Sequence, residues 1–448
     1  MVRIKRRQLV FAGLLTIGLL IPLTPQASAF LSGGQARTKV VYAGRLIDGV
    51  TDTLRTNVSI VIESDRIAKV EDGRITVPGA EVVDLSDSTV MPGLIDCHTH
   101  MTVQIAKGEQ PFLSFTRRNA DFAIAATVYA RRTLLAGFTT VRDAGAANFI
   151  DISLRDSINA GIVAGPRMFV ATRLLGITGG HGDFGNIRED IFPEPDYRNG
   201  IVNSPEDGVR AVRYVVKYGA DFIKIAATGG VLSVGDSSAG QQLSLAEMKA
   251  IVDAAHALGR KVAAHAHGAA GIKDALRAGV ASIEHGSYLD DEAIALFKEH
   301  GAYLVPTIIA GKTVEFNART PGYYPPTVEA KAREIGPLIQ NAFAKAYRGG
   351  VKIAFGTDAA VYPHGQNGKE FEYMVEAGMP PIEAILSATR AAADLLGQTA
   401  NIGSIQPGRY ADIVAVKGDP LKDIKLLQNI GFVMKAGQIY KRDGTATP

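Results

Sequence analysis

Two patterns of apolar and polar positions divide the chain. In segments 38–90 and 401–445, apolar and polar residues alternate in short runs, as in KVVYAGRLIDG and YADIVAVKGDP. Alternation with a period of two residues, broken by Gly, Asp and Asn, is typical of antiparallel strands with one buried face. Because neither end has enough strands to be stable alone, we expect both segments to form one small β-sandwich.

Between these ends, in residues 91–400, short apolar runs alternate with stretches of helical spacing. The segment SLAEMKAIVDAAHALG predicts an amphipathic helix that begins at a Ser244/Glu247 capping box, and the next segment, KVAAHAHG, predicts a strand. Regular alternation of this kind indicates a parallel sheet covered by helices.

Eight segments of the central region have strand character. They are VMPGLIDCHTH (90–100), FTTVRDA (138–144), PRMFVAT (166–172), DFIKIAA (221–227), KVAAHAHG (261–268), VASIEHG (280–286), AYLVPTII (302–309) and KIAFGTDA (352–359). Eight strand–helix units over about 300 residues fit an α/β fold of the TIM-like (β/α)8 barrel type. An open, doubly wound sheet is the alternative.

Residues 1–29 have the features of a secretory signal peptide. Four basic residues precede the apolar stretch Leu9–Leu23, and Ala27-Ser28-Ala29 is a small-residue cleavage pattern. The apolar stretch is shorter than the roughly 20 residues of a membrane span. We therefore expect an exported protein, periplasmic or secreted, that has no membrane attachment after cleavage.

Charge and cysteine content narrow the class of protein further. Removing residues 1–29 takes away four of the 48 basic residues and leaves 44 basic against 45 acidic residues, a net charge of −1. Nothing in this balance indicates a nucleic-acid partner. Cys97 is the only cysteine, so the exported chain makes no internal disulfide.

Polar residues follow several of the predicted strands at their carboxyl ends. His98 and His100 are two residues apart on one strand, so their side chains share a face, where they could hold a metal ion or simply make ordinary hydrogen bonds. His265, His285 and Asp358 each follow another strand in the same way. Barrel enzymes place their chemistry at this end. A closed barrel brings the first and eighth strands together, whereas an open sheet separates them.

Lys224 lies between Ile223 and Ile225 in an apolar run that predicts a buried strand. An ionised ammonium in an apolar interior costs several kcal/mol unless it is paired, and burial lowers the pKa of such an amine. The ordinary alternative is a lysine at a strand end whose ammonium reaches solvent.

With these residues, the chain resembles the amidohydrolase superfamily with binuclear metal centres over nearly all of residues 38–445. The resemblance rests on His98 and His100 on strand one, Lys224 on strand four, His265 and His285 on strands five and six, and Asp358 on strand eight. It implies that CO2 carboxylates Lys224 and that the carbamate bridges two divalent ions. The implied ligands are His98, His100 and Asp358 for one ion and His265 and His285 for the other.

The resemblance also implies a mechanism. A hydroxide that bridges the two ions attacks the substrate carbonyl, and Asp358 passes the proton of the water to the leaving amine. Asp358, Lys224 and His285 are the expected catalytic residues. Zinc is the expected metal, and manganese or cobalt also suits mixed nitrogen and oxygen ligands.

Candidate substrate contacts lie on loops at the same end of the barrel. The segment 174–200 has no helix or strand rhythm, and long irregular loops in compact domains are usually functional. It contains His181, which could reach over the barrel or could be an ordinary solvated histidine. The other candidates are Val231, His267, Tyr362, His364 and Arg142. Arg142 could bind a substrate carboxylate or pair with Asp143.

The loop sequences TGGHGD, GGVLS and HAHG resemble those of Xaa-Pro and Xaa-Arg dipeptidases and of amidohydrolases that cleave ochratoxin A, an N-acyl phenylalanine. The resemblance implies a dipeptidase- or carboxypeptidase-like hydrolase of N-acyl amino acids or dipeptides. It also implies a homo-oligomer, since octamers are common in this branch. The alternatives are a cyclic-amide hydrolase of the imidazolonepropionase type, which typically lacks the bridging lysine, and an exported metal- or solute-binding protein without turnover.

Overall fold

The structure is a computed structural model that describes residues 38–105, 107, 116–183, 190 and 193–447. The predicted signal peptide, residues 1–29, lies outside the described residues. Part of the predicted loop 174–200 also lies outside them, namely residues 184–189 and 191–192.

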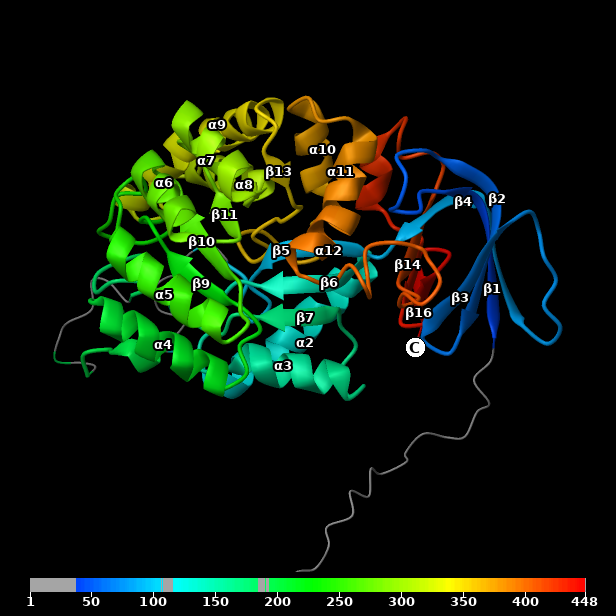
Figure 1. Ribbon diagram of the computed structural model, residues 1–448, viewed down its shortest axis with the longest axis horizontal. Coiled ribbons are helices and arrows are strands. Elements are labelled where there is room, and N and C mark those ends of the chain that lie inside the picture. The colour runs from blue at the N-terminus through cyan, green and yellow to red at the C-terminus, as the bar shows by residue number, and fades with distance from the viewer. Residues whose placement is uncertain (1–37, 106, 108–115, 184–189, 191–192, 448) are drawn as a thin grey trace, which may run out of the picture. The chain divides into compact units, whose positions relative to one another are not determined.

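Strands from both ends of the chain form one eight-stranded sheet in the order β17-β16-β15-β14-β4-β1-β2-β3 (Figure 1). The strands are β1 (Lys39–Leu46), β2 (Arg55–Glu63), β3 (Arg66–Asp72), β4 (Glu81–Pro92), β14 (Ile413–Lys417), β15 (Phe432–Lys435), β16 (Gln438–Arg442) and β17 (Thr445–Ala446). β14 pairs antiparallel with β4, which pairs parallel with β1. The C-terminal strands therefore extend the N-terminal ones directly.

This terminal sheet is one continuous sheet, whereas the alternation pattern led us to expect the two sheets of a sandwich. The β3 end of the sheet folds back onto the segment just before the central strand β14, because the Ile67 backbone N–H donates to Arg409 O (2.9 Å) and the Ala411 N–H donates to Asp65 O (2.8 Å). Ile60 and Met434, fully buried residues of β2 and β15, belong to the same apolar cluster. The curled sheet therefore encloses a core of its own, as two packed sheets would.

The central region contains parallel strands in two sheets, of order β5-β6-β7 and β8-β9-β10-β11-β12-β13. They are β5 (Leu94–Thr99), β6 (Phe138–Asp143), β7 (Arg167–Val170), β8 (Leu174–Leu175), β9 (Ile223–Ala226), β10 (Val262–Ala266), β11 (Ser282–His285), β12 (Tyr303–Val305) and β13 (Lys352–Ile353). Each of the eight segments with strand character contains one of these strands; β8 follows the third segment. The neighbours in each sheet follow the order of the sequence.

Backbone hydrogen bonds connect the first of these strands to the segment after the last. The Cys97 N–H donates to Phe355 O (2.8 Å), and the His100 N–H donates to Ala359 O (2.9 Å). Between β7 and β9, the Asp221 N–H donates to Val170 O (2.8 Å). A doubly wound sheet has its first and last strands apart, so these contacts argue against that alternative.

Helices lie outside the parallel strands in Figure 1. The α-helices are α2 (Asn119–Leu135), α3 (Ile150–Asn159), α4 (Pro205–Lys217), α5 (Leu245–Ala257), α6 (Ala269–Ala278), α7 (Asp291–His300), α8 (Ile308–Ala318), α9 (Pro326–Arg348), α10 (Lys369–Glu376), α11 (Pro381–Leu386) and α12 (Ala392–Leu395). The short helices are η1 (Tyr197–Asn199), η2 (Ser387–Ala391) and η3 (Ile424–Gln428). The predicted capping box is confirmed at α5, where Ser244 Oγ accepts from the Glu247 N–H. Across the described ranges, no helix is both long enough and apolar enough to cross a membrane.

The curled terminal sheet should depend on the close packing of its core. Replacing the fully buried Ile60 by Ala removes three carbons from a site that cannot collapse freely, so Ile60→Ala should lower the free energy of unfolding by about 2–5 kcal/mol. The control is Val82→Ala on β4, where the valine is 49% exposed, and its effect should stay within about 0.5 kcal/mol. Denaturant unfolding of both variants measures the difference, and equal effects would contradict this account of the core.

Candidate metal centre

The carboxyl ends of the parallel strands open into one cavity of about 570 Å³. All six residues that the sequence singles out as metal ligands line this cavity: His98, His100, Lys224, His265, His285 and Asp358. They come from β5 and the residue directly after it, from β9, β10 and β11, and from the segment after β13. Parallel strands whose ends meet at one edge bring residues together that are up to 260 positions apart in sequence (358 minus 98).

One group of these side chains surrounds the Nε2 atom of His98. The Lys224 Nζ lies 3.3 Å from this atom, and Asp358 Oδ1 lies 3.6 Å from it. The same carboxylate oxygen is 3.4 Å from the His100 Nε2. An amine, two imidazole nitrogens and a carboxylate oxygen therefore face a common point.

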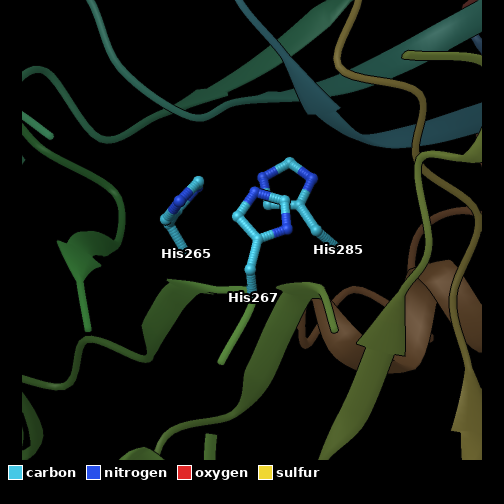
Figure 2. A group of neighbouring side chains, drawn as sticks. All are labelled: His265, His267 and His285. Carbon is cyan, nitrogen blue, oxygen red and sulfur yellow. The ribbon is translucent and has the colours of Figure 1, made fainter. Parts of the chain in front are cut away.

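A second group consists of three histidines, shown in Figure 2. Each of His265, His267 and His285 offers one nitrogen, and these three atoms all lie within 4.8 Å of one another. The ring of His285 lies with its centroid 5.0 Å from that of His98, so the two groups adjoin. His98, His285 and Asp358 likewise each offer one ligand atom, and these three atoms lie within 4.8 Å of one another.

Hydrogen bonds determine which nitrogen each ring presents to the cavity. The His98 Nδ1–H donates to Glu284 Oε2 (2.8 Å), and the His100 Nδ1–H donates to Gly145 O (2.9 Å). Both rings therefore present an Nε2 lone pair. His265 has the reverse arrangement, because its Nε2–H donates to Gly229 O (3.0 Å) and leaves Nδ1 free to act as a ligand. Partners of this kind orient histidine ligands in metalloproteins.

The carboxylate behind His98 is itself held in place. Glu284 is fully buried, and its Oε1 accepts from Arg142 Nη2 (2.7 Å) and from Ser282 Oγ (2.6 Å). The Arg142 Nε–H also donates to Cys97 O (2.6 Å). This network joins β5, β6 and β11 directly behind the ligand candidates.

Burial controls the charge of the imidazoles and of the amine. It lowers the pKa values of His98, His265 and His285 well below the usual value, so these rings are neutral at neutral pH. Burial also lowers the pKa of Lys224 to about 8, although the carboxylates of Glu284 and Asp358 oppose this shift. Neutral imidazoles are the form that binds metals, and part of the Lys224 population is an uncharged amine near pH 7 to 8.

Among the residues that line the cavity, His285 (φ 72°), Thr307 (φ 52°) and Asp358 (φ 58°) near the metal-ligand candidates have left-handed backbone conformations. Such conformations cost about 1–3 kcal/mol each and persist only where the surroundings enforce them. The Asp358 N–H donates to His98 O (2.8 Å), and the His285 Nδ1 lies 2.7 Å from Thr307 Oγ1. The local strain is thus maintained by contacts among the site residues themselves.

Comparison with known proteins assigns the family. Residues 89–440 match the Amidohydrolase family. The chain belongs to the amidohydrolase family.

Three relatives are similar to this amidohydrolase over most of their length. The ochratoxinase of Aspergillus niger is 33% identical over 446 residues, which cover 92% of this chain and 88% of the relative. The crystal structure of a Xaa-Pro dipeptidase with methionine bound in its active site has a TM-score of 0.88 and 45% identity, covering 90% of this chain and all of the other. A prolidase complexed with N-methylphosphonate-L-proline has a TM-score of 0.83 and 35% identity, with the same coverage of both chains.

Three of the six predicted substrate contacts of the amidohydrolase line the cavity: His181, Val231 and His267. The ring of His181 stacks on that of His265 with centroids 4.1 Å apart, and its Nδ1 lies 3.2 Å from Ser233 Oγ. The His267 Nδ1 lies 2.8 Å from Ser287 Oγ. Both rings therefore have one hydrogen-bonded nitrogen and one further nitrogen for a ligand.

The other three predicted substrate contacts lie elsewhere, which corrects the sequence-based expectation. Tyr362 is 3% exposed and belongs to a small apolar cluster away from the cavity lining. The ring of His364 stacks on Tyr129 (4.7 Å between centroids). Arg142 bonds to Glu284 rather than to Asp143 or to the cavity. The sequence predicts all three near the cavity because they lie close to strand ends, but their side chains pack against or bond to other residues outside the cavity lining.

Sequence reasoning missed Glu284 as the partner of both His98 and Arg142. The signal was present, because an acidic residue inside the apolar strand segment VASIEHG must be buried with a partner. The same reasoning that singled out Lys224 would have found it.

Glu284 should control metal affinity without touching the metal. Glu284→Gln keeps the size of the side chain but removes the charge that holds the His98 Nδ1–H, so the affinity of the amidohydrolase for zinc should fall by about 10–100-fold. Zinc retained after dialysis against graded chelator concentrations measures this effect. The control is Glu299→Gln on the exposed side of α7. Identical zinc retention in the two variants would contradict the positioning role of Glu284.

Proposed function

We propose that this amidohydrolase uses two divalent metal ions to cleave the amide bond of N-acyl amino acids or dipeptides, as a dipeptidase or carboxypeptidase does. The observation that carries the proposal is the buried amine of Lys224, 3.3 Å from His98 Nε2, in a cavity lined by four other ligand candidates. The Xaa-Pro dipeptidase and ochratoxinase relatives support an amide of an amino acid as the substrate, with ochratoxin A as one candidate.

The donor set fits two ions. His98, His100 and Asp358 would hold one ion, and His265 and His285 would hold the other. Their nitrogen lone pairs and carboxylate oxygen face the cavity, and the imidazoles are neutral, so binding requires no deprotonation of these rings. Zinc suits this mixture of nitrogen and oxygen donors, and manganese or cobalt would also fit.

Lys224 would complete both sites as a carbamate. Its pKa of about 8 leaves an uncharged fraction whose nitrogen can attack CO2, and loss of one proton gives the carbamate anion. The reaction replaces an uncharged amine beside the ligand candidates with an anion that has two oxygen donors. The two bound cations would compensate this anion, which otherwise would be costly to bury.

When bound, the ions supply a Lewis acid for the substrate carbonyl and lower the pKa of a water molecule. The chain supplies the proton transfer. Burial raises the pKa of Asp358, and the nearby His100 opposes the shift, so this carboxyl group can take a proton and deliver it to the nitrogen of the leaving amine. His181 and His267 would hydrogen-bond the substrate through the nitrogen that does not face Ser233 or Ser287.

We further propose that the parallel strands form a (β/α)8 barrel over residues 91–400, flanked by a domain from segments 38–90 and 401–445. The backbone bonds from β5 to the segment after β13 support this arrangement, as does the likeness to the solved relatives. Cleavage of residues 1–29, export and assembly into a homo-oligomer stay predictions.

Chelation should abolish hydrolysis by the mature chain. Prolonged dialysis against a strong chelator should remove the ions that activate the carbonyl, and added zinc, manganese or cobalt should restore the rate. Release of L-phenylalanine from N-acetyl-L-phenylalanine and from ochratoxin A measures activity, with magnesium as the control addition. A rate that persists after complete removal of metal would contradict the proposal.

Lys224 should carry a CO2 adduct in the holoenzyme. Protein reconstituted with zinc in 13C-bicarbonate should show a carbamate carbon signal by NMR, and Lys224→Ala should lack this signal and retain less than half of the metal. Lys435→Ala on β15 is the control, because burial lowers the pKa of this lysine to about 8 as well and it does not line the cavity. A Lys224→Ala protein that still binds two ions per chain would refute the bridge.

A further inference from the structure

One wall of the cavity is apolar and continuous. Val231 lies after β9, Ala310 and Val314 lie on α8, Ile335 and Ile339 lie on α9, and Val361 follows Asp358 in the chain; all six line the cavity and are at most 8% exposed. We call these six residues the apolar chamber. Apart from the ligand candidates Lys224 and Asp358, the charged residues of the lining are on other segments: Arg117 before α2, Arg173 after β7 and Asp183 after β8. The apolar chamber itself therefore contains no charged side chain.

The close approach of α8 and α9 sets the width of the chamber. A Cβ atom at Gly311 would lie 2.5 Å from the Cγ2 of Ile339, so only glycine allows the two helices to pack at this distance. Ile335 and Ile339 are four residues apart on α9 and thus share one face. The helices therefore present a fixed apolar surface to the cavity.

Lys331 holds the loop that carries Val231, which forms another side of the apolar chamber. Lys331 is one helical turn before Ile335, and its Nζ donates to Gly230 O (2.7 Å), Ser233 O (2.7 Å) and Asp236 Oδ1 (3.0 Å). These bonds tie the loop that carries Val231 to α9. Because these contacts hold the chamber open before a ligand binds, few side chains or loops must be ordered on binding. This lowers the entropic cost and favours affinity for a group of matching shape.

We propose that the apolar chamber binds a large apolar group adjacent to the scissile amide. This inference rests on the proposed function and narrows its substrate class to compounds with an aromatic or branched aliphatic group. The whole cavity, of which the chamber is one wall, has a volume of about 570 Å³, within the range of roughly 300–1,000 Å³ that holds small-molecule ligands. The wall offers no charge to pair with an acidic or basic side chain, whose burial there would be unfavourable. The group can come from the amino acid or from its acyl substituent.

Two substrate series test the proposal with the metal-loaded mature chain. The first keeps an acetyl group and varies the amino acid through glycine, alanine, leucine, phenylalanine and aspartate. The second keeps alanine and varies the acyl group through acetyl, butyryl, hexanoyl and phenylacetyl. In one of the series, kcat/KM should rise by about tenfold or more from the smallest to the largest apolar group, since a single methylene in a fitted pocket is worth about 10–200-fold. That series identifies which part of the substrate enters the chamber. A flat or falling trend in both would overturn the proposal.

A variant that narrows the chamber tests the residues directly. Ala310→Leu should lower kcat/KM for the largest group of that series by about tenfold and for the smallest by less than about threefold. The control is Ala330→Leu on the exposed side of α9, which should change neither value. Equal losses for large and small groups in a folded, metal-replete Ala310→Leu protein would contradict the proposal. If Ala310→Leu does not fold, Val314→Ala should instead reduce the preference for the large group by about threefold, and an unchanged preference would count against the chamber.

Failure of the proposed function gives a different result from failure of the chamber. If no compound of either series is hydrolysed, the proposed function fails. The chamber is then tested by calorimetric binding of N-acetyl-L-phenylalanine, N-acetylglycine and N-phenylacetyl-L-alanine. Binding of either large compound about tenfold tighter than that of N-acetylglycine would support the chamber, and equal or weaker binding of both would overturn it.

Discussion

A lysine amine held out of water among imidazoles is the constraint on which the rest of this site depends. An ammonium ion at Lys224 forms no ion pair with a carboxylate among the described residues, and its amine lies 3.3 Å from the His98 Nε2. Burial lowers its pKa to about 8, so the protein tolerates the residue by making its uncharged form accessible. In the proposed carbamate, this uncharged amine would react with CO2, and the adduct would share its oxygens with two cations. That role would account for a lysine within the apolar strand Ile223–Ala226.

The second feature of the site is that residues outside the cavity orient its histidines through hydrogen bonds. Glu284, Arg142 and Ser282 form a fully hydrogen-bonded group that orients His98, while Gly145, Gly229 and Thr307 contact the other rings. Left-handed conformations at His285 and Asp358 turn the backbone at the strand ends, where the ligand candidates are. A buried polar network of this kind is unfavourable when incomplete, so the network and the site should be lost together. The same hydrogen bonds should therefore determine both the arrangement of the ligand candidates and the local stability of these strand ends.

The sequence predicts the strands and the converging residues well because both follow from short-range patterns. Apolar runs identify each of the eight parallel-strand segments, and the polar residues that follow several of these runs mark the same edge of the sheet. The sequence fails where the outcome depends on side-chain direction. Tyr362, His364 and Arg142 lie near strand ends in sequence, yet packing against Ile309, Tyr129 and Glu284 turns them from the cavity. The terminal strands alternate as a sandwich would, but only the pairing of β14 with β4 shows that they form one curled sheet. The apolar chamber depends on the approach of α8 to α9, which no local pattern encodes.

The central claim is that six side chains from separate strands bind two cations, with the Lys224 amine converted to a shared anionic ligand. Anomalous diffraction from crystals of the zinc-loaded mature chain, collected on both sides of the zinc absorption edge, tests it most directly. The account predicts two separate anomalous peaks, one beside His98, His100 and Asp358 and the other beside His265 and His285, with extended density from the Lys224 Nζ reaching both. A single peak, no peak, or a Lys224 side chain that ends at a bare amine with the imidazoles turned elsewhere would contradict it.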